Sequence, residues 1–419
     1  MAKTNIVTGL DIGSGTIKLV SGFKKLSSSQ SNKTREEEEN IEILTKVKEV
    51  SFGVRRGIVV DVNKVSKIIA YLVEKSQEDC GKQIKEVIAS VGGSHIFSRN
   101  CHGLVSVSRA DQKISEEDID RVLQAAQTFS LPSNKEILDV LPKEFIVDGE
   151  GGVKDPLGMQ GIRLEVDAVA IVGFSPYLKN SEQAILNAGI TRIINLVPNP
   201  LASARAVLTS REKELGVVLL DIGAGTSNLA VFKEGNLIHL AILPIGSGHI
   251  TNDIAVCLKT DIDTAEKIKL QFGACFQEKK NKKKTRKKEQ IKIKGERPEE
   301  SLTFTPKTLS QIIGARVEEI LGEAQKELKK LGKIELPGGV VLTGGGAKMP
   351  KLKDFCKKYL KLPSRLGAPR GFSPQIDDPA FSTACGLLLE GLDSIEEESP
   401  SRLKGVWNQL KKFLREFVP

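Results

Sequence analysis

The sequence predicts an α/β protein built from two lobes, and three observations carry that prediction. At 419 residues the chain is longer than one hydrophobic core usually organises. Apolar runs of strand length alternate with longer stretches whose apolar residues recur at helical spacing. One turn also occurs twice, as Asp11-Ile12-Gly13-Ser14-Gly15-Thr16 and as Asp221-Ile222-Gly223-Ala224-Gly225-Thr226, each time after an apolar strand. Duplication of such a turn in a long chain indicates paired lobes.

The first part of the chain reads as strands followed by a helix. Strands are expected at Ile6–Leu10 and Ile17–Phe23, on either side of the first turn, and at Ile41–Val50. Apolar residues at helical spacing predict a helix over Lys64–Cys80, and Val87–Val91 restarts a strand.

The next part reads as a small unit of its own. Ser115 is a typical N-cap, and the acidic residues after it predict a helix to about Thr128. Turns that include Pro132 and Pro142 are expected to separate short strands up to Leu164–Val172. Strand–helix alternation then resumes and contains the second turn.

The net charge of +9 comes from one segment. Lys279–Arg297 holds eleven Lys or Arg against two Glu, an excess of nine that equals the excess of the whole chain. No aromatic residue lies in this segment, so it lacks the stacking platform of a single-strand nucleic-acid site. We expect a solvated basic loop and no nucleic-acid partner.

Targeting and redox signals are weak. No run of about 18 apolar residues is present, and Met1–Thr8 lacks the charged start and apolar core of a signal peptide. The six cysteines show no metal-ligand or redox spacing. We therefore expect a cytoplasmic protein with reduced cysteines.

Both repeated turns have the chemistry of a phosphate site. Their glycines let the backbone bend tightly and bring N–H groups against a phosphate. The hydroxyls of Ser14, Thr16 and Thr226 add donors. Asp11 and Asp221 end their strands, where a carboxylate can hold water on Mg²⁺. Lys18, just past the first turn, can offer a positive charge to phosphates, so two such turns facing one another would clamp a nucleotide.

Two further segments extend this site. Thr343-Gly344-Gly345-Gly346-Ala347-Lys348 follows an apolar strand and is interpreted as the floor under a nucleoside. Between the second and third turns, Glu266 and Lys269 lie three residues apart on one helix face, from which both could reach a ribose and base.

In this order the pieces resemble the actin, sugar kinase and heat-shock chaperone superfamily, and within it the whole chain resembles the FtsA family of bacterial cell-division proteins. Besides the turns, the resemblance rests on Ser90-Val91-Gly92-Gly93-Ser94-His95-Ile96, Asn100-Cys101-His102-Gly103, Phe145-Ile146-Val147-Asp148-Gly149, Asp155-Pro156-Leu157-Gly158-Met159, Pro200-Leu201-Ala202-Ser203 and Thr251-Asn252-Asp253-Ile254-Ala255.

The resemblance implies an actin-like (ribonuclease H-like) two-lobed fold with a family-specific subdomain, called 1C, and a C-terminal amphipathic helix. The implied boundaries are 1–83, 171–210 and 371–392 for subdomain 1A, 84–170 for 1C, 211–245 and 336–370 for 2A, 246–335 for 2B with the basic loop 279–297, 393–400 for a linker and 401–419 for the tail helix.

The resemblance also implies the ligands and partners. The family binds ATP, with Mg²⁺, and polymerises head to tail. It tethers FtsZ filaments to the cytoplasmic face of the inner membrane at the division site and recruits later division proteins. By superfamily position the FtsZ tail is expected on 2B and the later proteins on 1C.

Carried over residue by residue, the nucleotide site comprises Asp11, Gly13, Ser14, Gly15, Thr16, Lys18, Asp221, Gly223, Ala224, Gly225, Thr226, Glu266, Lys269, Gly344, Gly345, Gly346 and Lys348, with Asp11 and Asp221 holding Mg²⁺ through water. Only Asn199 and Asp221 are candidates for a catalytic role. Asn199 stands where chaperone relatives place an acidic residue, and an amide is no general base, so hydrolysis is expected to be slow. Gly246-Ser247-Gly248 departs from the family's usual double glycine.

The tail, Ser401–Pro419, is expected to lie on an anionic membrane surface. On a helix its apolar residues share one arc and its basic residues lie outside it, the pattern of interfacial helices. The apolar set is Leu403, Val406, Trp407, Leu410, Phe413, Leu414 and Phe417, and the basic set near it is Lys404, Lys411, Lys412 and Arg415.

Three other functions share this fold. A small-molecule kinase would need a catalytic Asp and a sugar-binding loop, neither of which is identifiable. A chaperone would need a substrate domain after the third turn, and too few residues follow Lys348. PilM, a pilus-assembly scaffold with a similar 1C subdomain, remains the alternative, and the basic tail favours FtsA over it.

Overall fold

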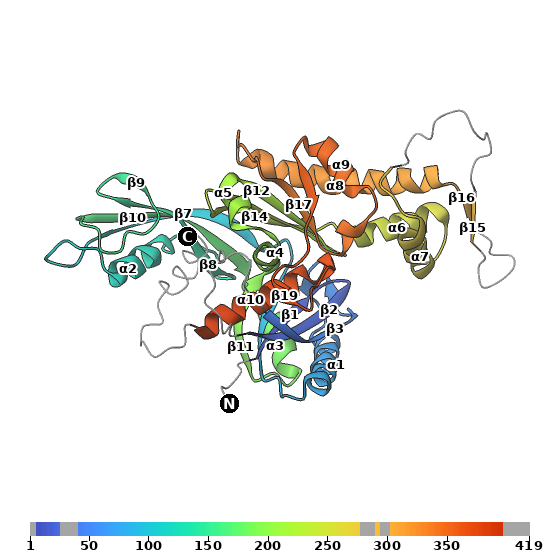
Figure 1. The fold of residues 1–419 in the computed structure, drawn as a ribbon, viewed down its shortest axis with the longest axis horizontal. Helices are drawn as coiled ribbons and strands as arrows, with labels where there is room; N and C mark the ends of the chain where they lie inside the picture. Colours follow the sequence, from blue (N-terminus) through green and yellow to red (C-terminus); the bar gives the residue numbers. More distant parts are fainter. Residues whose placement is uncertain (1–5, 26–40, 277–289, 294–301, 397–419) are drawn as a thin grey trace.

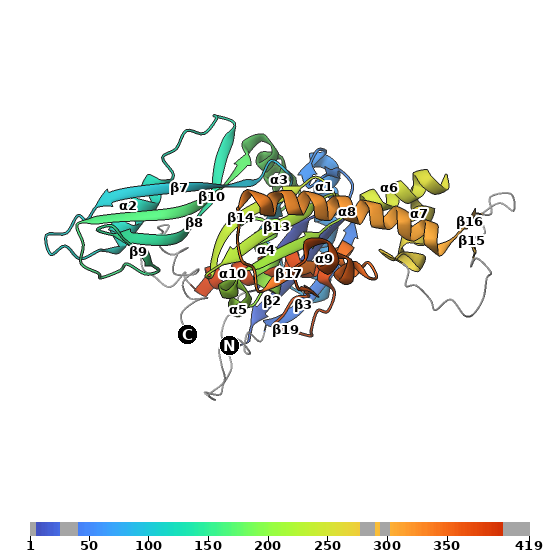
Figure 2. The same cartoon turned by 90° about the horizontal axis from the view of Figure 1, so that it is seen from above.

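The computed structural model describes residues 6–25, 41–276, 290–293 and 302–396 (Figure 1). It forms two lobes, each built on a sheet, with an insert projecting from one side and a helical extension from the other (Figures 1 and 2). The predicted tail helix 401–419 and most of the predicted basic loop lie outside the described residues. Residues 393–396 of the predicted linker belong to the last helix, and the rest of the linker lies outside the described residues.

Lobe I is built on a six-stranded sheet of order β11-β6-β1-β2-β3-β19. Its strands are β1 (Val7–Ile12), β2 (Thr16–Lys24), β3 (Ile41–Val50), β6 (Glu86–Val91), β11 (Arg192–Pro198) and β19 (Phe372–Ser373). Antiparallel pairing joins β1 to β2 and β2 to β3, whereas β6 runs parallel to both β1 and β11. The carboxyl ends of β1, β6 and β11 therefore meet at one edge of the sheet, which positions the site.

Lobe II shares a nine-stranded sheet of order β18-β17-β12-β13-β14-β7-β10-β8-β9 with the insert. The strands of lobe II are β12 (Val217–Ile222), β13 (Ser227–Lys233), β14 (Asn236–Leu243), β17 (Gly339–Thr343) and β18 (Ser364–Leu366). Those of the insert are β7 (Phe97–Ser106), β8 (Lys135–Val147), β9 (Glu150–Val153) and β10 (Arg163–Phe174). One Cα pair, Ala241 with Phe97, joins the two parts across β14 and β7.

Helices cover both lobes. The helices of lobe I are α1 (Val62–Cys80), α3 (Ser175–Asn187), α4 (Asn199–Val207) and α10 (Ser382–Glu396). Those of lobe II are α5 (Ser210–Leu215), α6 (Ser247–Leu258), α7 (Ile262–Phe272), α8 (Pro306–Lys330) and α9 (Leu352–Leu360), with short 3-10 turns η3 (Gly345–Lys348) and η4 (Pro379–Phe381). The insert carries α2 (Glu116–Ala126), and a small hairpin of β4 (Val54–Arg55) and β5 (Ile58–Val59) follows β3.

The lobes share a core around α4 and α10. Residues of both sheets, such as Val20 and Leu219, pack in one buried cluster with Leu387 of α10. The two helices cross at close range, because a Cβ placed on Gly386 would lie 1.7 Å from the Ala202 carbonyl oxygen. A larger residue at this crossing would separate the helices and with them the two lobes.

Separate clusters bury the other faces. In lobe I, α1 and α3 pack around Leu10, Ile69 and Ile185. In lobe II, α8 and α9 pack against strands of the sheet, whereas α6 packs against α8 and α7 against α6 in the helical extension. The predicted helix over Lys64–Cys80 is confirmed, and it begins two residues earlier because Asp61 caps it by accepting a hydrogen bond from the Lys64 N–H.

The insert differs from its prediction in two respects. It begins after β6, not at residue 84, because β6 pairs with β1 in the sheet of lobe I. Its strands are also longer than expected. Pro142 lies inside β8, not in a turn, because a register shift next to it removes the need for its missing N–H. The helix capped by Ser115 is confirmed, with Asp118 completing a capping box.

Part of the predicted basic loop is a strand. β15 (Ile291–Ile293) pairs with β16 (Leu302–Phe304), which leads into α8. This hairpin lies at the end of the helical extension of lobe II (Figure 1).

Candidate functional site

The two repeated turns lie against one another where the lobes meet. The first turn, Asp11–Thr16, connects β1 to β2, and the second, Asp221–Thr226, connects β12 to β13. A Cβ placed on Gly15 would lie 2.7 Å from the Ala224 Cβ, and one on Gly225 would lie 2.7 Å from the Ser14 Oγ. The glycines therefore allow an approach that side chains would prevent, and the structure brings both predicted turns to one place.

Asp11 is buried beside a cation. Lys18 Nζ lies 2.8 Å from Asp11 Oδ2, and both side chains are almost fully buried. Ser90 Oγ donates a hydrogen bond of 3.1 Å to Asp11 Oδ1 and accepts one of 2.9 Å from the Ile12 N–H. Both oxygens of this carboxylate therefore have a partner within lobe I.

Asp221 is buried among neutral donors. Ser203 Oγ donates to Asp221 Oδ2 at 2.7 Å and Asn228 Nδ2 at 3.1 Å, and Thr383 Oγ1 lies 3.4 Å away. Burial raises the pKa of Asp221 and the hydrogen bonds from Ser203 and Asn228 lower it, while the charge of Asp11 raises it and that of Lys18 lowers it. The net pKa shift is upward, and no described cation contacts this carboxylate as Lys18 contacts Asp11.

The start of α6 supports the second turn from behind. The Ser247 N–H and the Gly248 N–H donate to the carbonyl oxygens of Gly223 and Ala224, each at 2.8 Å. Ser247 Oγ also donates to the Gly223 carbonyl at 3.0 Å. Ser247, where the sequence departs from the family's double glycine, thus adds a bond to the turn.

The first turn is linked to the small hairpin of lobe I. Ser14 Oγ accepts a hydrogen bond of 2.7 Å from the Gly57 N–H, and the Ser51 N–H donates to the Gly15 carbonyl at 3.1 Å. The hydroxyl proton of Ser14 remains able to donate, as a phosphate site requires.

The third turn, Thr343–Lys348, adjoins the second. Gly344 has φ +85, and a Cβ on it would lie 2.1 Å from Asp221 Oδ1. Only glycine fits this backbone and this distance. Lys348 is half-exposed and lies 3.2 Å from Asp378 Oδ1, so it forms an ion pair at the rim.

Glu266 and Lys269 share one face of α7, as the sequence predicts. Lys269 Nζ lies 2.6 Å from Glu266 Oε2. Lys269 is buried and donates to Thr251 Oγ1 at 2.8 Å and to the Ser247 carbonyl at 3.4 Å. The pair is therefore connected to the second turn through α6.

Asn199 begins α4, next to the end of β6. A Cβ on Gly92 would lie 3.2 Å from Asn199 Nδ2. The Oδ1 atom of Asn199 is buried and has no hydrogen-bond partner in the part of the chain that the structure describes. Ser203, four residues later on α4, donates a hydrogen bond to Asp221, so Asn199 lies on the same helix face as a residue that contacts this carboxylate.

The residues fit a hydrated divalent cation better than a protein cage. Over the described ranges, no three His, Cys, Asp or Glu side chains gather as a metal site. The oxygens on offer are those of Asp11 and Asp221 and the buried, unpartnered amide oxygens of Asn199 and Asn228. Mg²⁺ keeps several waters and takes few carboxylates, and its waters need acceptors such as these.

Sequence reasoning missed four residues of this cluster: Ser90, Ser203, Asn228 and Thr383. Ser90 and Ser203 lie in motifs that carry the family resemblance, but those motifs assign neither residue to the site, and Thr383 lies in none of those motifs. Asn228 could have been found, because it follows Asp221 at the same interval at which Lys18 follows Asp11.

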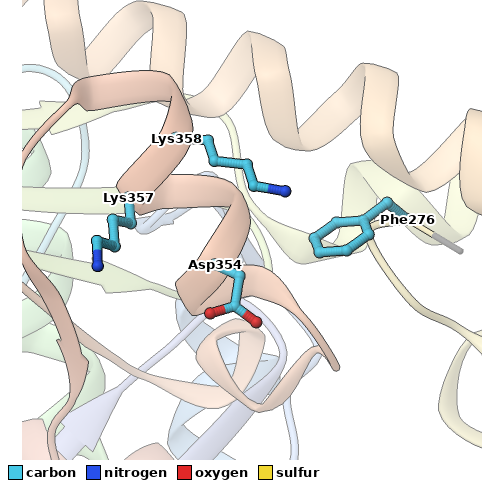
Figure 3. A pocket seen from close by; sticks show the side chains of 4 residues that line it. All are labelled: Phe276, Asp354, Lys357 and Lys358. Atoms are coloured by element: carbon cyan, nitrogen blue, oxygen red, sulfur yellow. The ribbon is translucent and has the colours of Figure 1, made fainter. Parts of the chain in front are cut away.

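A hollow lies away from the turns, between α9 and the segment after α7 (Figure 3). It has a volume of about 580 Å³ and is lined by Phe276, Asp354, Lys357 and Lys358. Lys358 Nζ lies 4.7 Å from the centre of the Phe276 ring, a cation–π contact. None of these residues belongs to the predicted nucleotide site.

Two lobes that each place a glycine turn at their junction define the class of actin-like ATPase folds. The PilM–PilN type IV pilus biogenesis complex matches with a TM-score of 0.62 and 17% identity, over 92% of this chain and 98% of that one. MreB5 of Spiroplasma citri bound to ADP matches with a TM-score of 0.55 and 11% identity, over 94% of this chain and 99% of that one. At these identities the likeness shows the fold alone.

Within that class, curated relatives define the family. Cell division protein FtsA of Pseudomonas aeruginosa is 34% identical over 82% of this chain and 81% of the relative, and that of Borreliella burgdorferi is 32% identical over 97% and 95%. The family model "Cell division protein FtsA" matches residues 218–386, and "SHS2 domain inserted in FTSA" matches residues 93–172. The chain belongs to the FtsA family of cell division proteins. Across the described residues, no helix has the length and apolar character needed to cross a membrane.

Proposed function

We propose that this chain is an ATP-binding, polymerising adaptor that links FtsZ filaments to the cytoplasmic face of the inner membrane during cell division. The observation that carries the proposal is the contact between the first and second turns beside two buried carboxylates. Glycine turns present N–H groups to phosphate, and the third turn and Glu266 extend the same junction toward a nucleoside.

The proposed site holds ATP with Mg²⁺. Lys18 and the turns bind the phosphates, Asp221 and Asp11 face the cation, and Lys269 fixes Glu266 toward the ribose. Mg²⁺, when bound, would offset the phosphate charge.

Turnover is expected to be slow. Asn199 cannot take a proton from water, and Asp221 Oδ2 already receives hydrogen bonds from Ser203 and Asn228. The ATP hydrolysis rate should lie far below the roughly 10 per second of a common enzyme. A steady-state phosphate-release assay tests this, and a rate in that common range would contradict an adaptor that uses ATP as a switch.

Partner binding is assigned to the outer surfaces. The helical extension of lobe II is proposed to take the FtsZ tail, and Val256 of α6 and Leu270 of α7, 77% and 73% exposed, support a docking surface there. The insert is proposed to engage a second copy, in a head-to-tail filament, and later division proteins.

A shortened insert, in which paired residues of β7 and β10 are joined by a new turn, tests the assignment of the insert to partner binding. His102 of β7 pairs with Asp167 of β10, so an Asn-Gly turn between them would remove α2, β8, β9 and the outer halves of both strands. The inner halves, which adjoin β14, remain. ATP binding should persist while filament assembly is lost. Loss of ATP affinity with assembly preserved would refute the assignment.

Membrane attachment is assigned to the tail, 401–419. Flotation with anionic vesicles, with and without ATP and FtsZ, tests it. Truncation after Ser399 should abolish flotation and leave ATP binding unchanged, and Trp407→Glu should nearly do so by placing a charge in the apolar stripe. Fluorescence of Trp407 should shift to the blue on vesicles. Flotation of the truncated chain at moderate salt would place the anchor elsewhere, with the basic segment 279–297 as the first suspect.

The PilM alternative is not favoured. The pilus complex shares 17% identity with this chain, whereas the curated FtsA relatives share about twice that over most of their length.

A further inference from the structure

Asn228 occupies in the second turn the position that Lys18 occupies in the first. In the β1–β2 pair Asp11 lies opposite Lys18, and in the β12–β13 pair Asp221 lies opposite Asn228. The two turns therefore have the same strand register and the same residues at five of six positions, but they differ in the residue that faces the carboxylate. One turn has a cation there and the other a neutral amide.

Because of this difference, the two carboxylates differ in which of their oxygens receive hydrogen bonds. Each oxygen of Asp11 has a donor of its own, Lys18 on Oδ2 and Ser90 on Oδ1. Around Asp221, the hydrogen bonds from described side chains all go to Oδ2. No described Lys or Arg is in ion-pair contact with Asp221. Of the two carboxylates, the one in lobe II is therefore the one that has no cation in contact among the described residues and can take a cation from outside the chain.

The amide of Asn228 can point only one way. Its Nδ2 donates to Asp221 Oδ2 at 3.1 Å, and the reversed amide would set its oxygen against a carboxylate oxygen. Oδ1 is therefore fixed as the free end. It is buried and has no hydrogen-bond partner among the described residues, and Asn199 Oδ1 is in the same condition. A buried acceptor left without a donor costs stability, so both oxygens point to a ligand that donates.

We propose that Asn228 is a positioning residue for a hydrated divalent cation, which lies on the Asp221 side of the junction and not midway between the lobes. Its amide N–H holds the Asp221 carboxylate, and its amide oxygen accepts a hydrogen bond from a metal-bound water. Asn199 accepts from a second water. This inference rests on the proposed binding of ATP and specifies how the cation of that same site is held.

The test compares ATP affinity with and without Mg²⁺. A fluorescent ATP analogue is titrated into the full chain in EDTA and in Mg²⁺, and Mn²⁺ binding in the presence of ATP is followed by electron paramagnetic resonance. Asn228→Ala should reduce the Mg²⁺-dependent gain in affinity and the Mn²⁺ affinity about tenfold or more, as loss of an outer-shell metal partner does. Affinity in EDTA should change less than threefold.

Asn228→Lys reproduces the first turn in the second. The ammonium should pair with Asp221 as Lys18 pairs with Asp11, abolish the Mg²⁺-dependent gain, and maintain or increase affinity in EDTA. Ser203→Ala is the comparison variant, because it removes a donor to the same Asp221 oxygen but leaves the Asn228 amide. Its loss of the Mg²⁺-dependent gain should be clearly smaller.

Four results would overturn the inference. An Asn228→Ala variant that loses affinity equally in EDTA and Mg²⁺ would show that Asn228 supports the phosphates and not the cation. An Asn228→Lys variant that keeps the Mg²⁺-dependent gain would place the cation away from Asp221. A parent chain that binds ATP without gain from Mg²⁺ would overturn the inference but leave the proposed nucleotide site, whereas a parent that binds no ATP would overturn both.

Discussion

The first and second turns of this molecule have nearly the same sequence, yet their carboxylates lie in opposite surroundings. Asp11 shares its burial with Lys18, and Asp221 shares its own with Ser203 and Asn228. The glycines of the motif set the backbone of each turn, whereas residues outside the motif supply the cation or the neutral donors that contact each carboxylate. Similarity of sequence in the two turns is therefore no evidence that they do the same work.

The strongest test of the contact between the turns is Gly225→Asp. Its Cβ would lie 2.7 Å from Ser14 Oγ, and its carboxylate would face phosphate. Like-charge opposition of several kcal/mol should lower ATP affinity by about 100-fold or more, measured with labelled ATP. Gly81→Asp at the end of α1 is the control for a new Asp away from the site, because nothing lies within 4 Å of its Cβ. Its φ of +66 costs some stability but leaves the turns unchanged, so its ATP affinity should match the parent. Affinity within a few-fold of the parent for Gly225→Asp would show that phosphate does not bind between the turns.

Lys18→Met tests the charged side of the comparison. The substitution leaves Asp11 buried without its cation, which should lower the free energy of unfolding by about 3–5 kcal/mol in urea titrations. Asn228→Leu removes a neutral bond and should cost about 1–3 kcal/mol. Adding Asp11→Asn to Lys18→Met should recover much of the loss. Equal losses of unfolding free energy for Lys18→Met and Asn228→Leu would mean that the charge of Lys18 is no more important to its carboxylate than the amide of Asn228 is to Asp221.

Asp221→Asn tests the uncompensated side, and its effect should have the opposite sign. Because the folded-state pKa of Asp221 is raised above 3.8, stability falls as the pH rises from about 3.8 through that folded pKa, and above it the ionised group opposes folding. Without nucleotide the variant should therefore be more stable by about 1 kcal/mol at neutral pH, as often follows relief of a strained functional site. The advantage should vanish toward pH 4 in thermal melts. A variant less stable than the parent at neutral pH would show that the carboxylate is compensated after all.

Lys348→Ala should have the smallest effect. Its ion pair with Asp378 is half-exposed, so the loss of stability should be under about 1 kcal/mol. If Lys348 reaches the adenosine, as the family resemblance implies, ATP affinity should also fall several-fold, which a titration would show. Unchanged affinity would leave Lys348 as a rim residue of the third turn.

The repeated turns and the strands around them could be predicted from the sequence because glycine spacing and apolar runs are local signals. Ser203 and Thr383 could not, since they reach Asp221 only through the packing of α4 and α10. Pro142 gave a wrong prediction: proline is typical of a turn, but here a register shift next to it lets the strand continue. Local rules failed where tertiary contacts supplied the missing partner.

The chain enters and leaves the insert through lobe I, but the insert's first strand pairs with β14 of lobe II. Ser98 strengthens this joint by bonding the backbone of Leu240 in both directions, at 2.9 and 3.1 Å. Asn236 Nδ2 adds a bond of 2.8 Å to the Lys143 carbonyl. The insert is thus attached to lobe I through the chain and to lobe II through hydrogen bonds. A rotation of one lobe against the other would strain these bonds, so we expect them to couple the position of the insert to the angle between the lobes.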